Sequence, residues 1–384
     1  MSIIYLDFNR TTSTAPSVIE AMQPYWSNHF MLPTQSHAHA SAVAEAIESA
    51  RERVGALLGA DPFELVFTSG GTEANNLAIL GSVDPVSDSA QNERSGGPPH
   101  LLVAEIEHES VLLPAQYLSR LGWQVETVPC DSNGLVDVEQ FAERIRPTTR
   151  LACLQLANPV LGTVQPVREL ADLCHGRGVR VHCDATTAVG KIPVDAVALR
   201  VDTLAVCGHK MYGPKGCGAL YVRRGLGLQA TLHGEPREMG LRAGSENVPG
   251  IVGMGAAAYL AHRCVDEAAV KMAERRQQLI DGLREVIGTE LVILAEAVDG
   301  LPNTVSVQMP TDAKRIQRAA RQLVVASAQS DQPPDEMTRV LRAIGRSDKQ
   351  IGRTLRISVG WTTSYDQIDR AINLLAEATE CPSL

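Results

Sequence analysis

The chain has 384 residues, of which 44% are hydrophobic and 21% are charged, and its formal net charge is −9. Single hydrophobic cores stop growing at about 250–300 residues, so this length predicts two domains. The acidic balance argues against nucleic acid or an anionic membrane surface as a partner, because both attract a basic face. No apolar run approaches the roughly 20 residues needed to cross a bilayer. The N-terminus shows no signal-peptide pattern, so we expect no membrane partner.

The eight cysteines form no C-x-x-C motif and show no zinc spacing. Several lie in apolar, strand-like runs such as residues 151–156, where a thiol is usually a small core residue. We therefore expect a reduced, cytoplasmic protein without a metal site.

Short runs rich in Val, Ile and Leu alternate with longer amphipathic stretches. Strands buried on both faces and separated by helices predict an α/β domain with a mostly parallel, seven-stranded sheet. The predicted strands, in chain order, are residues 65–68, 101–105, 125–128, 151–156, 179–182, 203–206 and 219–222. The helical patterns between or before them are residues 42–58, 109–121 and 168–175.

A smaller α+β domain is predicted beyond the last of these strands. The predicted division assigns residues 15–258 to the large domain and residues 1–14 and 259–384 to the small one. Polar segments with Gly or Pro at 87–99 and 331–335 are expected to be surface loops. The predicted elements of this region are a long helix at 250–287, strands at 303–308 and 355–359, and helices at 335–344 and 365–376.

The strongest local motif follows the predicted strand 203–206 and reads Cys207-Gly-His-Lys-Met-Tyr-Gly-Pro-Lys-Gly-Cys-Gly. A lysine at the carboxyl end of a strand faces the crevice where α/β sheets bind ligands. Lys210 can be desolvated there and act as an amine nucleophile. Gly-His-Lys alone would better fit a solvated loop lysine, so a catalytic role depends on whether other segments complete a site.

Three other segments supply the parts of a pyridoxal 5'-phosphate (PLP) site. Asp184, after a predicted strand, can pair with a protonated pyridine nitrogen, although alone it would more often be a helix cap. Gly71 and Thr72, where a strand runs into a helix, can present N–H groups and a hydroxyl to a phosphate. Many helices begin with such residues, so this feature is weak by itself. His108, just past another strand, has a ring able to stack on an aromatic cofactor.

These segments, in this order and spacing, resemble the cysteine desulfurases of the class V aminotransferase family, which are PLP enzymes of fold type I. The resemblance implies the fold type I PLP-transferase architecture, with a large α/β domain and a smaller C-terminal domain. It rests on Tyr5-Leu-Asp-Phe-Asn-Arg-Thr-Thr, Phe67-Thr-Ser-Gly-Gly-Thr-Glu-Ala-Asn-Asn, Gly208-His-Lys-Met-Tyr-Gly-Pro-Lys-Gly, Leu241-Arg-Ala-Gly-Ser-Glu-Asn-Val-Pro-Gly and Leu355-Arg-Ile-Ser-Val-Gly.

The resemblance also implies roles for individual residues. Lys210 would hold PLP as a Schiff base, Asp184 would pair with the pyridine nitrogen, and His108 would stack on the ring. Arg356 matches the arginine that binds the substrate's α-carboxylate, a task suited to a planar, bidentate guanidinium. Ser245 matches a phosphate ligand supplied by the neighbouring subunit, so a homodimer with shared active sites is implied. The other implied cofactor-binding residues are Gly71, Thr72, Asn158, Thr187, Cys207 and His209.

The chain departs from the family where a cysteine desulfurase carries its sulfur-accepting cysteine. That cysteine lies on a mobile loop, and its thiolate attacks the sulfur of the bound substrate. Alignment puts Ala328 or Gln329 in its place, and no cysteine occurs between Cys264 and Cys381. The usual nucleophile is therefore absent, and the role of the segment 325–336 is open.

Further departures cluster around the same site. Thr187 stands where the family has a glutamine, and Cys207 replaces a phosphate-binding serine. Cys207 is either an alternative thiol or a small residue on the phosphate side. Arg10, in a segment that is usually Asn-Asn-Ala-Thr-Thr, either binds the second carboxylate of a diacid substrate or forms a surface salt bridge.

We therefore expect a PLP enzyme that acts on a small amino acid through an external aldimine, without an enzyme persulfide. With Lys210 as general base, C–S β-elimination, aminotransferase chemistry or racemisation could follow. One alternative is a cysteine desulfurase that passes sulfur to a partner protein or a small thiol. Another is a non-catalytic paralogue acting as scaffold or regulator, against which the retained Lys210, Asp184, His108 and Arg356 argue.

Overall fold

The computed structural model describes residues 3–83, 97–328 and 335–380 of the chain. Its larger part is built on a seven-stranded sheet with the strand order β2-β8-β7-β6-β5-β3-β4. Strand β8 runs antiparallel to both of its neighbours, and the other neighbouring pairs are parallel. The strands are β2 (Leu65–Thr68), β3 (His100–Ala104), β4 (Gln124–Val128), β5 (Thr149–Cys153), β6 (Arg180–Asp184), β7 (Thr203–Cys207) and β8 (Gly218–Val222).

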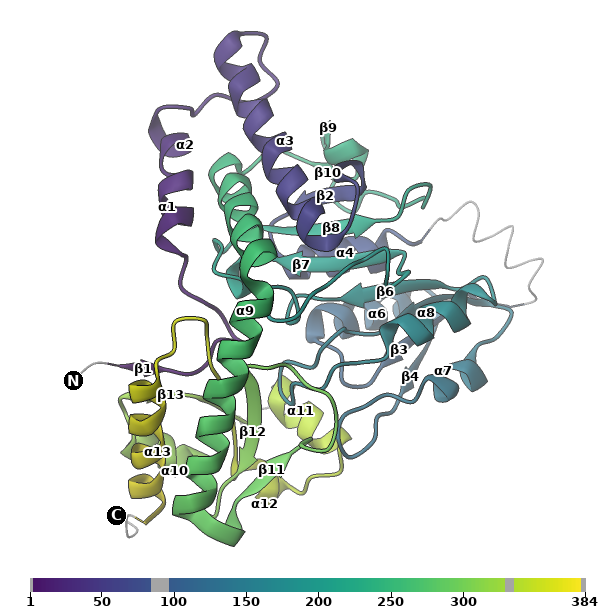
Figure 1. Cartoon of the computed structure of the whole chain (residues 1–384). Helices are drawn as coiled ribbons and strands as arrows, with labels where there is room; N and C mark the ends of the chain where they lie inside the picture. The colour runs from purple at the N-terminus through teal and green to yellow at the C-terminus, as the bar shows by residue number, and fades with distance from the viewer. Residues whose placement is uncertain (1–2, 84–96, 329–334, 381–384) are drawn as a thin grey trace.

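Helices cover both faces of this sheet (Figure 1). Helix α4 packs with α6 on one face, and α3 packs along α9 on the other. Because the sheet is covered on both sides, its inner strands are buried along almost their whole length. The helices of this part are α1 (Pro16–Met22), α2 (Pro24–Ser27), α3 (Ala38–Leu58), α4 (Gly71–Leu80), α6 (Glu109–Arg120), α7 (Val138–Arg144), α8 (Val167–His175) and α9 (Val248–Ile287).

A second, antiparallel sheet with the order β11-β12-β15-β14 forms the smaller part. The N-terminal segment joins it, since β1 (Ile4–Tyr5) pairs in parallel with β13 (Leu323–Val324). The other strands are β11 (Val292–Leu294), β12 (Thr304–Gln308), β14 (Ala326–Ser327) and β15 (Thr354–Ser358). The helices are α10 (Ala313–Ala319), α11 (Glu336–Ala343), α12 (Asp348–Ile351) and α13 (Tyr365–Glu380).

The forty-residue helix α9 runs from the large part into the small part and packs against both (Figure 1). Its buried residues as far as Ala261 belong to the core of the large sheet, and those from Ala268 onward belong to the core of the small one. The domain boundary predicted at 258/259 falls inside this helix and stays a prediction.

The predicted fold class is confirmed, and each of the seven predicted large-sheet strands is present with its ends shifted by a few residues. The sequence analysis missed the short elements, including α1, α2 and the hairpin of β9 (Pro236–Arg237) and β10 (Arg242–Ala243). Of the two predicted loops, only residues 97–99 and Asp335 lie among the described residues. Within the described part of the chain, every helix is too short or too polar to cross a membrane.

Candidate active site

A cavity of about 360 Å³ opens at the carboxyl ends of the parallel strands, the usual ligand-binding edge of an open α/β sheet. Residues from loops that are far apart in sequence meet there. The predicted site residues that line it are Arg10, Gly71, Thr72, His108, Cys207, His209, Lys210 and Arg356. Most of the site residues predicted from the sequence therefore lie around one cavity.

Lys210 lies on a short 3-10 turn (Gly208–Lys210) that begins where β7 ends. Its Nζ donates a hydrogen bond to Oγ1 of Thr187, at 3.2 Å. Thr187 is buried in the segment after β6, so the amine is directed into the protein and not into bulk solvent.

Asp184 is the last residue of β6 and is 6% exposed. Burial works to raise the pKa of its carboxyl group, but the positive charge of Lys210 and the hydrogen bond from Thr186 outweigh burial and lower that pKa. One carboxylate oxygen accepts from the backbone N–H of Thr186 at 2.9 Å, and the other accepts from Nδ2 of Asn75 at 2.8 Å. A buried carboxylate that stays ionised fits a cationic partner such as a protonated pyridine nitrogen.

A chain of buried side chains connects Asp184 to His108. Nδ2 of Asn75 also donates to Oγ of Ser110, at 2.8 Å, and Oδ1 of Asn75 lies 3.0 Å from Nε2 of His182. Burial lowers the pKa of His182 to about 4, so its ring is neutral and donates from Nε2 to the amide oxygen. The backbone N–H of Ser110 donates to Nδ1 of His108, which places the neutral-ring proton of His108 on Nε2. Sequence reasoning missed Asn75 and Ser110.

The start of α4 forms a compact cradle beside these groups. Gly70 has φ +151° and ψ −179°, a conformation essentially restricted to glycine. A Cβ on Gly71 would lie 2.6 Å from Cγ2 of Thr186, so the backbone approaches the cavity wall closely. The first N–H groups of a helix have no intrahelical partner, and this end of α4 can therefore bind an anion such as a phosphate.

Cys207 and His209 lie on the cradle side of the cavity. Burial raises the pKa of Cys207, so the group is a neutral thiol and not a thiolate, which argues against its use as an alternative nucleophile. Burial and the charges of Lys210 and Lys215 lower the pKa of His209 to about 4. Its ring Nδ1 lies 3.1 Å from Oγ1 of Thr11. Both residues therefore offer neutral polar groups near the start of α4.

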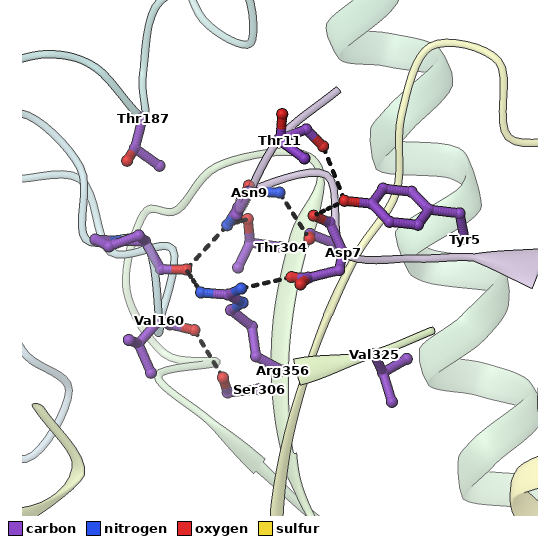
Figure 2. A network of polar contacts seen from close by, with 12 residues as sticks. Tyr5, Asp7, Asn9, Thr11, Val160, Thr187, Thr304, Ser306, Val325 and Arg356 are labelled. Atoms are coloured by element: carbon purple, nitrogen blue, oxygen red, sulfur yellow. Dashed lines mark hydrogen bonds and ion pairs between the residues drawn. The ribbon is translucent and has the colours of Figure 1, made fainter. Parts of the chain in front are cut away.

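Arg356, on β15, is fixed between two groups of the protein (Figure 2). Its Nη2 forms an ion pair with Asp7, and its Nη1 donates to the carbonyl of Pro159 at 3.3 Å. Its Nε is buried and has no hydrogen-bond partner among the described residues. Asn9 donates to the same Pro159 carbonyl at 3.0 Å (Figure 2). The guanidinium is thus held rigidly and keeps an unused donor.

Four predicted cofactor residues do not line the cavity: Asp184 and Thr187, whose contacts are given above, and Asn158 and Ser245. Asn158 uses its side-chain oxygen to accept from the backbone N–H groups of Val160 and Leu161, both at 2.9 Å, and so closes a turn. Ser245 is exposed in the loop after β10. Arg10 does line the cavity, but the predicted surface salt bridge has no partner within residues 3–83, 97–328 and 335–380.

The segment expected in place of the cysteine loop is described as far as Ala328, which is buried. Before it, β14 pairs with β15 so that Ala326 lies opposite Arg356. Gln329, the other position considered for the cysteine, lies outside the described residues, as do residues 330–334. Among the residues that are described, no group of three His, Cys, Asp or Glu side chains is arranged to hold a metal ion.

A seven-stranded sheet of this kind, with a lysine turn after one strand and a buried acid at the end of its neighbour, is the architecture of fold type I PLP-dependent enzymes. The chain matches the family described as "Aminotransferase class-V" over residues 4–323, and it belongs to that family. It is a cysteine desulfurase-like enzyme of this PLP-dependent family.

Curated relatives and solved structures agree on this placement. The chain is 36% identical to cysteine desulfurase IscS 1 of Archaeoglobus fulgidus, covering 98% of this chain and 97% of the relative, and 36% identical to cysteine desulfurase IscS of Methylobacillus flagellatus, covering 97% and 91%. A solved NifS-like protein is 31% identical with a TM-score of 0.89, and the match covers 98% of both chains. A structure of SspA in complex with cysteine is 31% identical with a TM-score of 0.79, covering 94% of this chain and 99% of that one.

Proposed function

We propose that the chain binds PLP at Lys210 and converts a small amino acid without an enzyme persulfide, by C–S β-elimination or by aminotransferase chemistry. The observation that carries the proposal is the amine of Lys210 at a cavity bordered by the start of α4, near enough to buried Asp184 for its charge to lower the pKa of that carboxyl group. The second support is the lack of any cysteine between Cys264 and Cys381. When bound, PLP supplies an electron sink for charge that develops on the substrate.

Each side chain then has a defined task. Asp184 would pair with the protonated pyridine nitrogen of the cofactor, and Asn75 keeps its carboxylate in place. Lys210 takes the proton from the substrate's Cα with Nζ, while Thr187 orients that amine. Arg356 would bind the α-carboxylate from the cavity wall, where Asp7 and the Pro159 carbonyl hold its guanidinium in place. The cradle at Gly71, Thr72, Cys207 and His209 would hold the phosphate.

Elimination tolerates the missing thiolate better than desulfuration does. When the Cβ–S bond breaks by elimination, the leaving sulfur takes the electron pair, and no enzyme sulfur is needed. For L-cysteine the balanced outcome is cysteine plus water giving pyruvate, ammonium and hydrogen sulfide. The structural relative solved in complex with cysteine supports a substrate of this kind. Desulfuration with transfer to a partner protein or a small thiol is the alternative outcome.

The proposal includes a cytoplasmic homodimer with shared active sites. Ser245 is exposed and lies outside the cavity of its own chain, as expected for a residue that serves the neighbouring subunit. Large apolar side chains are exposed around α1 and α2, among them Trp26 at 67% and Phe30 at 71%, and such a patch suits an interface. Sedimentation velocity should give twice the chain mass, and a monomer that is active alone would contradict shared sites.

The test uses protein purified with PLP and incubated separately with L-cysteine, L-cystine and other amino acids. Sulfide with pyruvate identifies a lyase, and a keto acid with the cofactor left in its amine form identifies an aminotransferase. Alanine with sulfur transferred to an added thiol identifies a desulfurase. The Lys210→Ala variant should lose covalent cofactor and its visible absorbance. A variant that keeps this absorbance, or a wild-type protein that never acquires it, would refute the proposal.

A further inference from the structure

The cavity at Lys210 borders a second cavity of about 320 Å³, within the size range of small-molecule sites. Arg10, Asp335, Glu336 and Arg356 line both cavities, so they mark where the two meet. A substrate whose α-carboxylate lies at Arg356 would have its side chain free to extend into the second cavity.

Two of the four shared side chains already have partners inside the protein. Arg356 is paired with Asp7, and a side-chain oxygen of Asp335 accepts from the backbone N–H of Thr338 at 2.9 Å, at the start of α11. The charge of Arg356 and the capping oxygen of Asp335 are thus accounted for by contacts within the protein.

Arg10 and Glu336 are different. Among the described residues, neither side chain has an ion pair or a hydrogen bond, and Oε1 of Glu336 is buried without a partner. Burial lowers the pKa of Arg339 while the charge of Glu336 works to raise it, but the two side chains do not form an ion pair. Both terminal nitrogens of Arg339 instead donate to the backbone carbonyls of Glu105 and Glu107. Exposed Arg10 and half-buried Glu336 therefore present a cation and an anion to both cavities, and the described part of the chain supplies neither with an ion-pair or hydrogen-bond partner.

We propose that the second cavity recognises the distal ammonium and carboxylate of a bis-amino acid whose two halves are joined through sulfur. Arg10 binds the distal carboxylate, and Glu336 binds the distal ammonium. The inference rests on the proposed function, since it takes the half held at Arg356 and Lys210 to be the reacting one.

Other substrate classes use the two charges less well. A dicarboxylic amino acid pairs with Arg10 but brings a second anion next to unpaired Glu336. A simple amino acid such as cysteine carries no distal charged group to pair with either side chain. Desolvating a charge without a partner is unfavourable, so a ligand that supplies both an anion and a cation binds best.

The test compares four ligands that differ only at the distal end. L-Lanthionine carries both distal groups, S-(2-carboxyethyl)-L-cysteine only the carboxylate, S-(2-aminoethyl)-L-cysteine only the ammonium, and S-ethyl-L-cysteine neither. Binding is measured by calorimetry on holoenzyme whose bond between Lys210 and the cofactor has been reduced with borohydride, so that ligands bind without turnover. We expect lanthionine to bind about tenfold or more tightly than S-ethyl-L-cysteine, as charge-assisted hydrogen bonds imply.

Variants assign the two charges. Arg10→Gln should remove the advantage conferred by the distal carboxylate, and Glu336→Gln the advantage conferred by the distal ammonium. Arg120→Gln, which removes an exposed arginine at the end of α6, is the matched control and should keep the wild-type order of affinities.

Equal affinities for lanthionine and S-ethyl-L-cysteine would overturn the inference. So would a carboxyethyl ligand that binds as tightly as lanthionine, because only an anion would then be recognised. In either case, turnover of S-ethyl-L-cysteine by unreduced holoenzyme would leave the proposed function intact. A protein that never attaches the cofactor would refute the proposed function and this inference with it.

Discussion

Asn75 is the residue on which the buried polar groups around Asp184 depend. Its amide donates to Asp184 and Ser110 and accepts from His182, so Asn75→Ala leaves three buried groups short of a partner. A hydrogen bond to a charged group contributes about 1.5–3 kcal/mol, and a buried group left unpaired costs about 1–3 kcal/mol. We expect the free energy of unfolding of the apoprotein to fall by about 2–4 kcal/mol. Loss of the donor also removes one hydrogen bond to the ionised form of Asp184, so the pKa of this carboxyl group should rise.

Two measurements check this prediction: urea unfolding of the apoprotein, and titration of the apoprotein with PLP. A less well-held carboxylate at Asp184 should raise the dissociation constant of PLP about tenfold or more, because a lost hydrogen bond to a charged group costs about 1.5–3 kcal/mol and about 1.4 kcal/mol equals a factor of ten. The control is Asn76→Ala on the same helix, because Asn76 is only half-buried and its side chain donates to the carbonyl of Thr72, at 2.8 Å. If the two variants unfold alike and bind PLP alike, the network does not support Asp184 and the reasoning is refuted.

Three further changes test the surrounding structure. Burial lowers the pKa of His182 to about 4, below its unfolded value of about 6.5, so the stability it contributes is complete above pH 6.5. Roughly 3 kcal/mol should be lost as the pH falls from 6.5 to 4, and urea unfolding of His182→Gln at several pH values should show a shallower dependence. Gly70→Ala forces a side chain onto φ +151°, so unfolding should become easier by about 1–3 kcal/mol and PLP should bind more weakly; wild-type values would contradict the cradle. Arg51→Ala leaves buried Glu238 without its bidentate partner and should cost about 3–5 kcal/mol in thermal or urea unfolding, whereas a cost near zero would mean that Glu238 finds other partners.

The large sheet could be predicted because its strands have a physical signature in the sequence. A parallel strand covered on both faces is a continuous apolar run, and turn residues bound each run. The turn that carries Lys210 could be predicted in the same way, because it directly follows such an apolar run. The short elements α1 and α2 have no such run, because only Val18 among their residues is buried.

The side chains that hold the site residues in place could not be predicted, because they are distant in sequence from the residues that they contact. Asn75 lies 109 positions from Asp184, and Asp7 lies 349 positions from Arg356. No periodicity or local motif encodes such pairs, which exist only after the sheet and the N-terminal segment have been placed. The choice for Arg10 between a salt bridge and a ligand contact likewise depended on which carboxylates the fold brings within reach.

Two of the sequence departures from the desulfurase pattern lie at one wall of the site, because Arg10 and residues 325–327, which precede the position of the usual cysteine, all line the second cavity. The segment that would lead to a sulfur-accepting cysteine is anchored there, because Gln317 donates to the carbonyl of Val325 at 2.8 Å and Ser327 donates to Gln317 at 2.8 Å. Strand β14 also holds this segment against β15, directly opposite Arg356. A persulfide carrier must swing between substrate and acceptor, and an anchored wall without a thiol is poorly suited to that task. Next to the charge of Arg10, the same wall suits the proposed selection of a substrate by its distal groups, and on that proposal the absent cysteine and the presence of Arg10 have a common reason.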